Sequence, residues 1–162
     1  MDNKKKLKIT IPSFPFPPQL SKLYNSFYKN GKVNKVKSKE YTQYLKEVNA
    51  YHWARESEFR EARDALKEFE SFKMTYYVMF PYSKVFTKKG ALKKCDVSNR
   101  EKALSDSLAI CLGIDDQRFN NVELIKCVAT NEENPKVIII IEPMKILTES
   151  EVLELILLQK KQ

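Results

Sequence analysis

Apolar and polar residues alternate along residues 7–11, where Leu-Lys-Ile-Thr-Ile has the two-residue period of a strand with one buried face. Residues 72–80 are rich in aromatic side chains and end at Pro81, as a buried strand does. Two further apolar runs cover residues 122–128 and 137–141. This pattern predicts about four strands.

Between the first two strands, residues 38–70 have the hydrophobic period of helices. Ser38 is a suitable N-cap, because its side chain can accept a hydrogen bond from a backbone N–H of the first turn. One helical stripe then holds Tyr41, Leu45, Val48 and His52. Residues 56–70 continue with helical spacing, and we expect a break at Ser57.

Two more helices are expected towards the C-terminus. One begins near Ser98 and ends at Gly113, since glycine is the preferred residue just after a helix. After Pro143, Thr148 and Glu151 have the spacing of a capping box. The box predicts a helix whose apolar run is residues 152–158.

Four segments show neither the two-residue period of a strand nor the period of a helix. Four prolines make residues 12–18 an extended segment. Residues 20–37 mix aromatic residues and lysines around Asn30-Gly31, and they are predicted to form a long loop with a turn. Residues 84–94 form a basic loop, and residues 130–135 form a polar turn between the last two strands.

These elements predict an α+β fold: a small mixed sheet of about four strands packed with two or three helices, plus a C-terminal helix. The 162 residues suit one domain, residues 1–162. Its core would span residues 7–143, and a C-terminal helical extension would span residues 148–160.

The composition favours a cytoplasmic protein. No apolar run reaches the roughly 18 residues that a membrane span needs, and the N-terminal residues lack the apolar segment of a secretory signal. The three cysteines are odd in number and lack the paired spacing of a zinc site. Reduced thiols in the cytoplasm are therefore expected.

Positive charge is concentrated in two stretches of the chain, whose formal net charge is +8. Residues 1–46 contain eleven lysines and two acids, and residues 84–94 contain five lysines and no acid. Such stretches can form one positive surface, which is typical of proteins that bind a phosphate backbone. Solvated lysines that aid solubility are the alternative.

The candidate chemistry lies between residues 93 and 117. Asp96 stands where the basic loop enters the predicted helix, Lys102 lies inside that helix, and Asp115 and Asp116 follow its far end. A helix of about 14 residues is near 20 Å long. The carboxylates can therefore meet only if the chain doubles back and places the next strand beside the helix entry.

The pattern Asp-x-Ser-Asn-x-x-Lys-Ala-Leu-x-Asp-x-Leu, followed by Gly-Ile-Asp-Asp-Gln, resembles the RusA family of Holliday-junction resolvases. The usual family core is Asp-Leu-Asp-Asn, followed by a helical lysine and an Asp-Asp pair. The resemblance is specific over residues 93–117 and diffuse elsewhere. It implies a RusA-like domain that cuts branched DNA, such as four-way junctions, by magnesium-dependent phosphodiester hydrolysis as a homodimer. Mn²⁺ is the alternative ion.

The resemblance also implies roles for individual residues. The catalytic residues would be Asp96, Lys102 and Asp116; the metal ligands Asp96, Asp116, Asp115 and Ser98; and the supporting residue Asn99. The lysines that grip DNA would be Lys29, Lys32, Lys35, Lys37, Lys84, Lys88, Lys89, Lys93 and Lys94. If Asp96 and Asp116 share one magnesium ion, their carboxyl groups should lie about 3–5 Å apart.

Ser98 departs from the family pattern, because it stands where the second carboxylate of the core is expected. Removing that negative charge should weaken metal binding. Ser98 could instead be an N-cap that forms a capping box with Glu101. Likewise, Lys102 could form a surface ion pair with Asp106, and the Asp115-Asp116 pair could be an ordinary polar turn.

Two other functions stay open. A branched-DNA-binding protein with a degraded metal site is favoured by Ser98. An interaction protein that docks a partner through residues 152–158 is favoured by the apolar character of that segment. The aromatic residues Tyr24, Phe27 and Tyr28 fit either stacking on unpaired bases or anchoring of their loop in the core.

Overall fold

A computed structural model describes residues 7–130 and 134–159. Its main sheet has the order β1-β6-β4-β5, built from β1 (Ile9–Pro15), β6 (Lys136–Pro143), β4 (Phe72–Phe80) and β5 (Phe119–Val128). β6 is antiparallel to both β1 and β4, whereas β4 and β5 are parallel. The predicted α+β fold with a mixed four-stranded sheet is confirmed.

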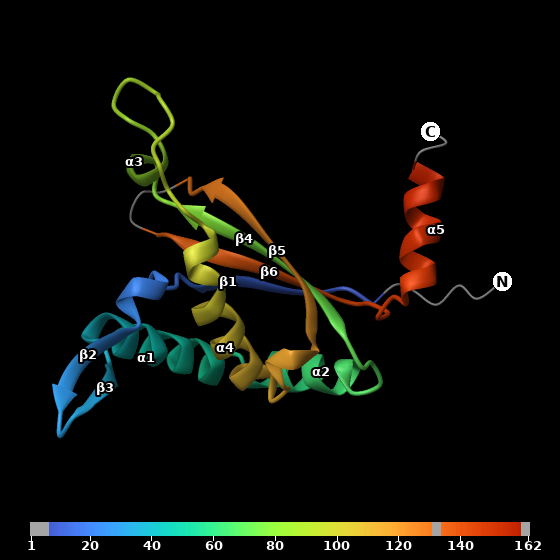
Figure 1. Ribbon diagram of the computed structural model, residues 1–162, viewed down its shortest axis with the longest axis horizontal. Helices are drawn as coiled ribbons and strands as arrows, with labels where there is room; N and C mark the ends of the chain where they lie inside the picture. Colours follow the sequence, from blue (N-terminus) through green and yellow to red (C-terminus); the bar gives the residue numbers. More distant parts are fainter. Residues whose placement is uncertain (1–6, 131–133, 160–162) are drawn as a thin grey trace.

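Three helices pack on one face of this sheet (Figure 1): α1 (Lys39–Ala54), α2 (Glu56–Leu66) and α4 (Glu101–Leu112). The Ser38 hydroxyl accepts a hydrogen bond from the Tyr41 backbone N–H at 2.9 Å, so the predicted cap of α1 is present. The break before α2 falls at Arg55, two residues before the predicted position. Gly113 ends α4 with a φ of 62°, a left-handed conformation that glycine adopts without steric cost.

The core forms where alternate residues of β4 meet α4. Met74, Tyr76 and Val78 on β4 are fully buried, as are Leu104 and Leu108 on α4. Two buried hydroxyl contacts hold α4 in place: Tyr76 Oη of β4 lies 3.0 Å from Ser105 Oγ, and Tyr44 Oη of α1 lies 2.8 Å from Ser107 Oγ. These pairs satisfy polar groups that would otherwise be costly to bury.

The loop predicted over residues 20–37 is wrong. After the short helix η1 (Leu20–Lys22), strands β2 (Tyr24–Lys29) and β3 (Lys32–Lys37) form an antiparallel hairpin. Asn30 and Gly31 both have positive φ, 52° and 73°, which is the conformation of a type I′ turn. All twelve strand residues are exposed, so no hydrophobic alternation was available to indicate strands.

The remaining elements are short, apart from the last helix. They are α3 (Tyr82–Val85), η2 (Ser98–Arg100) and η3 (Asp116–Arg118). The last helix, α5 (Glu149–Gln159), begins with the predicted capping box: the Thr148 backbone N–H donates to the Glu151 carboxylate at 2.9 Å. In Figure 1, α5 stands away from the sheet and its helices. Residues 131–133 of the predicted turn and residue 160 of the predicted extension lie outside the described residues.

Within the described ranges, we find no helix with the length and apolar character needed to cross a bilayer.

Candidate functional site

Asp96 lies between the basic loop and α4, where Ser98 holds its carboxylate. Asp96 Oδ1 accepts hydrogen bonds from the Ser98 hydroxyl at 2.6 Å and from the Ser98 backbone N–H at 2.9 Å. These bonds, the hydroxyl bond first, hold the pKa of the Asp96 carboxyl below its usual value. Asp96 is therefore an exposed, oriented anion at neutral pH.

The capping box considered for Ser98 and Glu101 is not formed. Ser98 opens a 3₁₀ turn ahead of the helix, and its hydroxyl is used by Asp96. Glu101 instead accepts a hydrogen bond from the Ser105 hydroxyl at 2.5 Å, one turn further along α4. The extra 3₁₀ turn moves the start of α4 beyond the reach of Ser98.

Lys102 lies in the first turn of α4 and remains largely exposed. Its Nζ is 3.0 Å from Asp106 Oδ2, so the predicted surface ion pair is formed. The hydrogen bond to Asp106 raises the pKa of Lys102, with a smaller contribution from the charge of Asp116. Because the side chain of Lys102 is 55% exposed, its ammonium group stays accessible to a ligand.

The two aspartates after α4 form the predicted polar turn. Asp115 caps η3 by accepting the Gln117 backbone N–H at 2.9 Å, and Asp116 is the exposed first residue of η3. Arg118, at the end of η3, donates to the backbone oxygens of Phe69 and Glu70, just before β4. Both aspartates therefore lie where β4 and β5 begin.

Asp96 and Asp116 lie at opposite ends of the sheet. Asp96 lines a hollow together with Phe80 and Pro81, at the end of β4. Asp116 precedes β5, whose first residue is paired with the first residue of β4. A strand of nine residues spans about 27 Å. Since β5 runs parallel to β4 from the far end of α4, one chain does not bring these carboxylates together.

Two basic projections extend from the body of the molecule. The hairpin β2–β3 carries Lys29, Lys32, Lys35 and Lys37, and α3 with the loop after it carries Lys84, Lys88, Lys89, Lys93 and Lys94. In Figure 1, the loop after α3 projects at the upper left, near the beginning of α4, and the hairpin projects at the lower left, beside α1. All nine lysines are exposed. Asp96 shares a hollow with Lys84 and Lys94 of the second projection.

A family model described as endodeoxyribonuclease RusA matches residues 15–142. The chain belongs to the RusA endodeoxyribonuclease family. The match includes the segment from Asp96 to Asp116 and confirms the resemblance seen in the sequence; α5 follows the matched range. No curated protein matches the chain. Membership of the RusA family implies nuclease activity on Holliday junctions, and such nucleases generally depend on a divalent metal ion.

The described part of this RusA-family chain does not by itself fit a divalent metal ion. It contains no group of three or more His, Cys, Asp or Glu side chains placed to hold one. Asp96 and Asp115 are ordered by local hydrogen bonds, so their oxygens are of the type that magnesium prefers. They are nevertheless at separate ends of the molecule, and a complete ligand set is not formed within one chain.

Arg100 is a candidate RusA site residue that the sequence alone did not single out. It donates a hydrogen bond to the Pro17 oxygen, and its guanidinium lies 4.5 Å from the centroid of the Phe16 ring. Burial lowers the pKa of Arg100, and its Nε has no hydrogen-bond partner among the described residues. Its position beside Asn99 in the family motif was the available signal.

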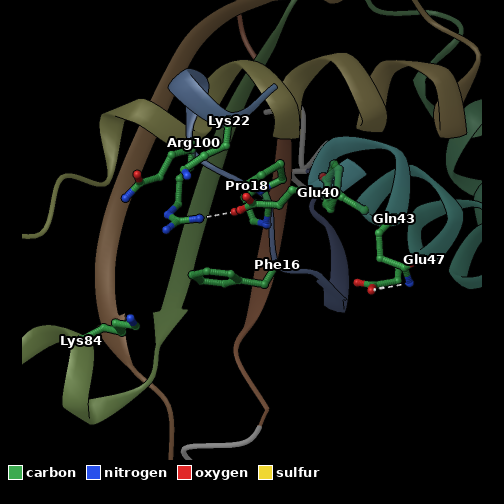
Figure 2. A pocket seen from close by; sticks show the side chains of 11 residues that line it. Phe16, Pro18, Lys22, Glu40, Gln43, Glu47, Lys84 and Arg100 are labelled. Carbon is green, nitrogen blue, oxygen red and sulfur yellow. Dashed lines mark hydrogen bonds between the residues drawn. The ribbon is translucent and has the colours of Figure 1, made fainter. Parts of the chain in front are cut away.

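Arg100 lies between two adjoining hollows of about 430 and 560 Å³, and both are also lined by Phe16, Gln19 and Lys84. Figure 2 shows Arg100, Lys22 and Lys84 around the first hollow, with Glu40, Gln43 and Glu47 of α1 on its other side. The second hollow adds Lys94 and Asp96. A partly apolar recess with basic side chains on one wall and the acidic side chains of α1 on the other therefore adjoins the Asp96 carboxylate.

Proposed function

We propose that this chain is a homodimeric, structure-selective endonuclease that resolves Holliday junctions and related branched DNA in the cytoplasm. Hydrolysis of the phosphodiester would depend on magnesium, with manganese as a substitute. The observation that carries the proposal is the family motif around Asp96 and Lys102, in a chain that also carries two exposed basic projections. Two cuts on opposing strands call for two sites, which a two-fold homodimer supplies.

The two projections suit a ligand with a phosphate backbone. Their lysines are exposed, and the loop over residues 84–94 contains no acid. On the hairpin, Tyr28 is 75% exposed and Phe27 is 44% exposed, which suits stacking on unpaired bases at a branch point. Tyr24, in contrast, packs edge-on against Tyr41 with ring centroids 5.7 Å apart, so it anchors the hairpin to α1.

We assign to Lys102 the role of stabilising negative charge on the reacting phosphate. Its ammonium group is exposed, and Lys102 is the second residue of α4, the helix that follows the Asp96 segment. A fixed cation at this place would stabilise the negative charge that develops as the phosphodiester bond breaks. Asp96, Asp116, Asp115 and Ser98 are proposed as metal ligands, with Asn99 in support, because magnesium prefers oxygen ligands.

Cleavage of a labelled synthetic four-way junction tests the proposed function. We expect paired cuts near the branch point with magnesium, none with a chelator, and none on a linear duplex of the same sequence. Asp96→Asn should abolish cutting while the protein still binds the junction. Tight binding with no cleavage in magnesium or manganese would refute the nuclease assignment.

The alternative of a non-catalytic branched-DNA-binding protein is favoured by one specific observation. Ser98 replaces a family carboxylate, and it uses its hydroxyl to hold Asp96 rather than adding a charge. In that case, junction affinity in a chelator should equal affinity in magnesium. A metal-dependent rise in affinity or any junction cleavage would exclude this alternative.

The alternative of an interaction protein is favoured by the exposed apolar residues of α5, among which Leu153, Leu157 and Leu158 are more than half exposed. Mass measurement in solution, with and without residues 146–162, separates the two uses of this segment. Fewer chains per particle in the truncated form indicate self-association through this segment, and an unchanged number of chains with loss of a partner from cell extract indicates docking.

A further inference from the structure

Arg100 is a half-buried cation for which the described residues supply no anion. Its guanidinium lies between two rings, 4.5 Å from the centroid of Phe16 and 5.1 Å from that of Phe80. Within the described ranges, it donates to the Pro17 backbone oxygen and takes part in none of the ion pairs. Withdrawing a charge from water without an opposite charge is costly, so this position favours an anionic ligand.

Two other arginines that lie over aromatic rings have more partners within the chain. Arg55 lies 5.0 Å from the centroid of the Tyr51 ring, and its Nη1 is 3.0 Å from the Glu58 carboxylate. Arg118 donates to two backbone oxygens. Arg100 instead lines the two adjoining hollows, which we call the Arg100 recess.

Phe16 gives the Arg100 recess a surface on which a base can stack. Its half-buried ring lines both hollows, and in Figure 2 it extends beneath the Arg100 guanidinium. Phe80 holds this ring edge-on, with the centroids 5.2 Å apart. Unpaired bases stack on aromatic rings and on guanidinium planes, whereas the faces of a base inside a duplex are covered by its neighbours. The recess therefore favours an unpaired nucleotide.

The two polar walls of the recess suit different parts of a nucleotide. Lys84 lies on the side of Arg100, where a phosphate would be held. The opposite wall presents Glu40, Gln43 and Glu47 of α1. Gln43 Nε2 donates to the Glu47 carboxylate at 3.1 Å, so this wall is rich in acceptors. Acceptors suit the amino groups on the edges of adenine, cytosine and guanine, and thymine has no such group.

We propose that the Arg100 recess holds one unpaired nucleotide of a DNA strand, with its base on Phe16, its phosphate beside Arg100 and Lys84, and its base edge towards α1. The hollows of about 430 and 560 Å³ fall within the roughly 300–1,000 Å³ typical of ligand sites. Asp96 also lines the second hollow, so the nucleotide would lie next to the phosphate that is cut. That placement rests on the proposed function. A branch point supplies such a nucleotide readily, because a base that is already unpaired costs least to extrude.

Junction binding in a chelator tests the recess without cleavage. Two four-way junctions would differ at one position of the branch point, where one carries an unpaired deoxyadenosine and the other an abasic residue. The wild type should bind the deoxyadenosine junction about tenfold more tightly by fluorescence anisotropy, because the base adds a stacking contact. Arg100→Leu should reduce this preference to about twofold or less. Arg55→Leu is the matched control and should keep it, because Arg55 also lies over a ring but is ion-paired.

Phe16→Leu separates stacking from packing, since leucine keeps an apolar side chain against Phe80 but has no flat ring. This variant should also lose the preference for deoxyadenosine over the abasic residue. Thermal unfolding establishes that each variant is folded. A junction with thymidine at the same position should bind the wild type about threefold more weakly than the deoxyadenosine junction. Equal binding of the two would refute the placement of the base edge towards α1.

The preference for a base also decides the proposal as a whole. Equal affinity of the wild type for the deoxyadenosine and abasic junctions, or an undiminished preference in folded Arg100→Leu or Phe16→Leu, would overturn it. Micromolar binding of free deoxyadenosine monophosphate without any base preference in the junction would assign the recess to a free nucleotide and overturn it too. A wild type that shows the preference but never cuts in magnesium would refute only the proposed function.

Discussion

At the residue scale, Ser98 and Lys102 show how local contacts set the chemistry of the site. Ser98 donates both its hydroxyl and its backbone N–H to Asp96, so it orients the carboxylate and keeps it ionised. Lys102 is paired with Asp106 yet exposed, and an exposed pair of this kind is worth only about 0.3–0.5 kcal/mol. Lys102 can therefore leave Asp106 for a phosphate at little cost.

Lys102→Ala should lower the rate of junction cleavage by about 10²–10³-fold, because it removes a fixed cation near the reacting phosphate. Junction affinity should stay within about twofold, since Lys102 is one cation among many on the surface. Lys67→Ala is the matched control, because Lys67 is also an exposed lysine paired to an aspartate, Asp64, at 2.5 Å. Cleavage by Lys102→Ala as fast as by the control would show that the lysine is wrongly assigned.

Ser98→Asp should raise the affinity for Mg²⁺ or Mn²⁺ by about tenfold, because it adds the carboxylate that the family pattern has at this position. Isothermal titration calorimetry measures the change. Ser98→Ala is the control: it removes the hydroxyl without adding charge, so the pKa of Asp96 should rise towards its usual value. If metal affinity is equal in Ser98→Asp and Ser98→Ala, this position is not part of a metal site.

At the scale of elements, the hairpin β2–β3 forms without a buried face. Its turn has the backbone twist that matches the flanking strands, and its base is closed by the Ser38 backbone N–H donating to the Leu23 oxygen at 3.0 Å. Apart from Tyr24, which packs on Tyr41, its side chains are therefore exposed to a ligand. The loop after α3 differs, because Lys93 Nζ donates to the Ser83 oxygen at 2.6 Å and so secures one side of it.

Replacing Lys88, Lys89, Lys93 and Lys94 together with glutamine should weaken junction binding and flatten its salt dependence. For every phosphate that the variant no longer neutralises, the slope of log affinity against log salt should fall by about 0.9 on duplex arms. Fluorescence anisotropy over a range of salt concentrations measures the slope. Lys46→Gln/Lys67→Gln is the control, because both lysines are exposed outside the two projections. An unchanged slope in the fourfold variant would exclude this loop from the DNA surface.

At the scale of the whole molecule, the folded body ends where β6 ends. The Met144 backbone N–H donates to the Ser71 oxygen at 3.0 Å, and the Ser71 hydroxyl donates to the Met144 oxygen at 2.6 Å, which fixes the end of the last strand. The family match also ends at residue 142. By contrast, α5 follows the exposed residues 145–148 and presents exposed apolar side chains.

Ending the chain after Lys145 should leave the body folded, with a free energy of unfolding within about 1 kcal/mol of the full chain. The reason is that α5 keeps its apolar side chains exposed, so its removal uncovers little of the core. Leu108→Ala is the comparison, and it should cost about 2–5 kcal/mol because Leu108 is fully buried. Urea unfolding measures both. A truncation as costly as Leu108→Ala would mean that α5 packs on the body in solution.

The sequence by itself determined the elements that bury a face or carry a local signal. Four strands, the cap of α1 at Ser38, the end of α4 at Gly113 and the capping box of α5 all follow from patterns within a few residues. The motif around Asp96 also identified the family, which the match over residues 15–142 confirms. These features depend on side-chain periodicity and on nearby backbone hydrogen bonds, so they can be predicted from short stretches of the chain.

Only the tertiary structure decided how distant segments pair. The hairpin over residues 24–37 has no buried face to create a hydrophobic period, and its strands became visible only through their pairing. Asp96 is separated from Asp116 because β5 pairs in parallel with β4. β5 therefore begins beside the start of β4, at the far end of α4, whereas Asp96 lies at the end of β4. Strand order and direction are set by packing between residues far apart in sequence. They therefore cannot be predicted from a pattern within a short stretch of the chain.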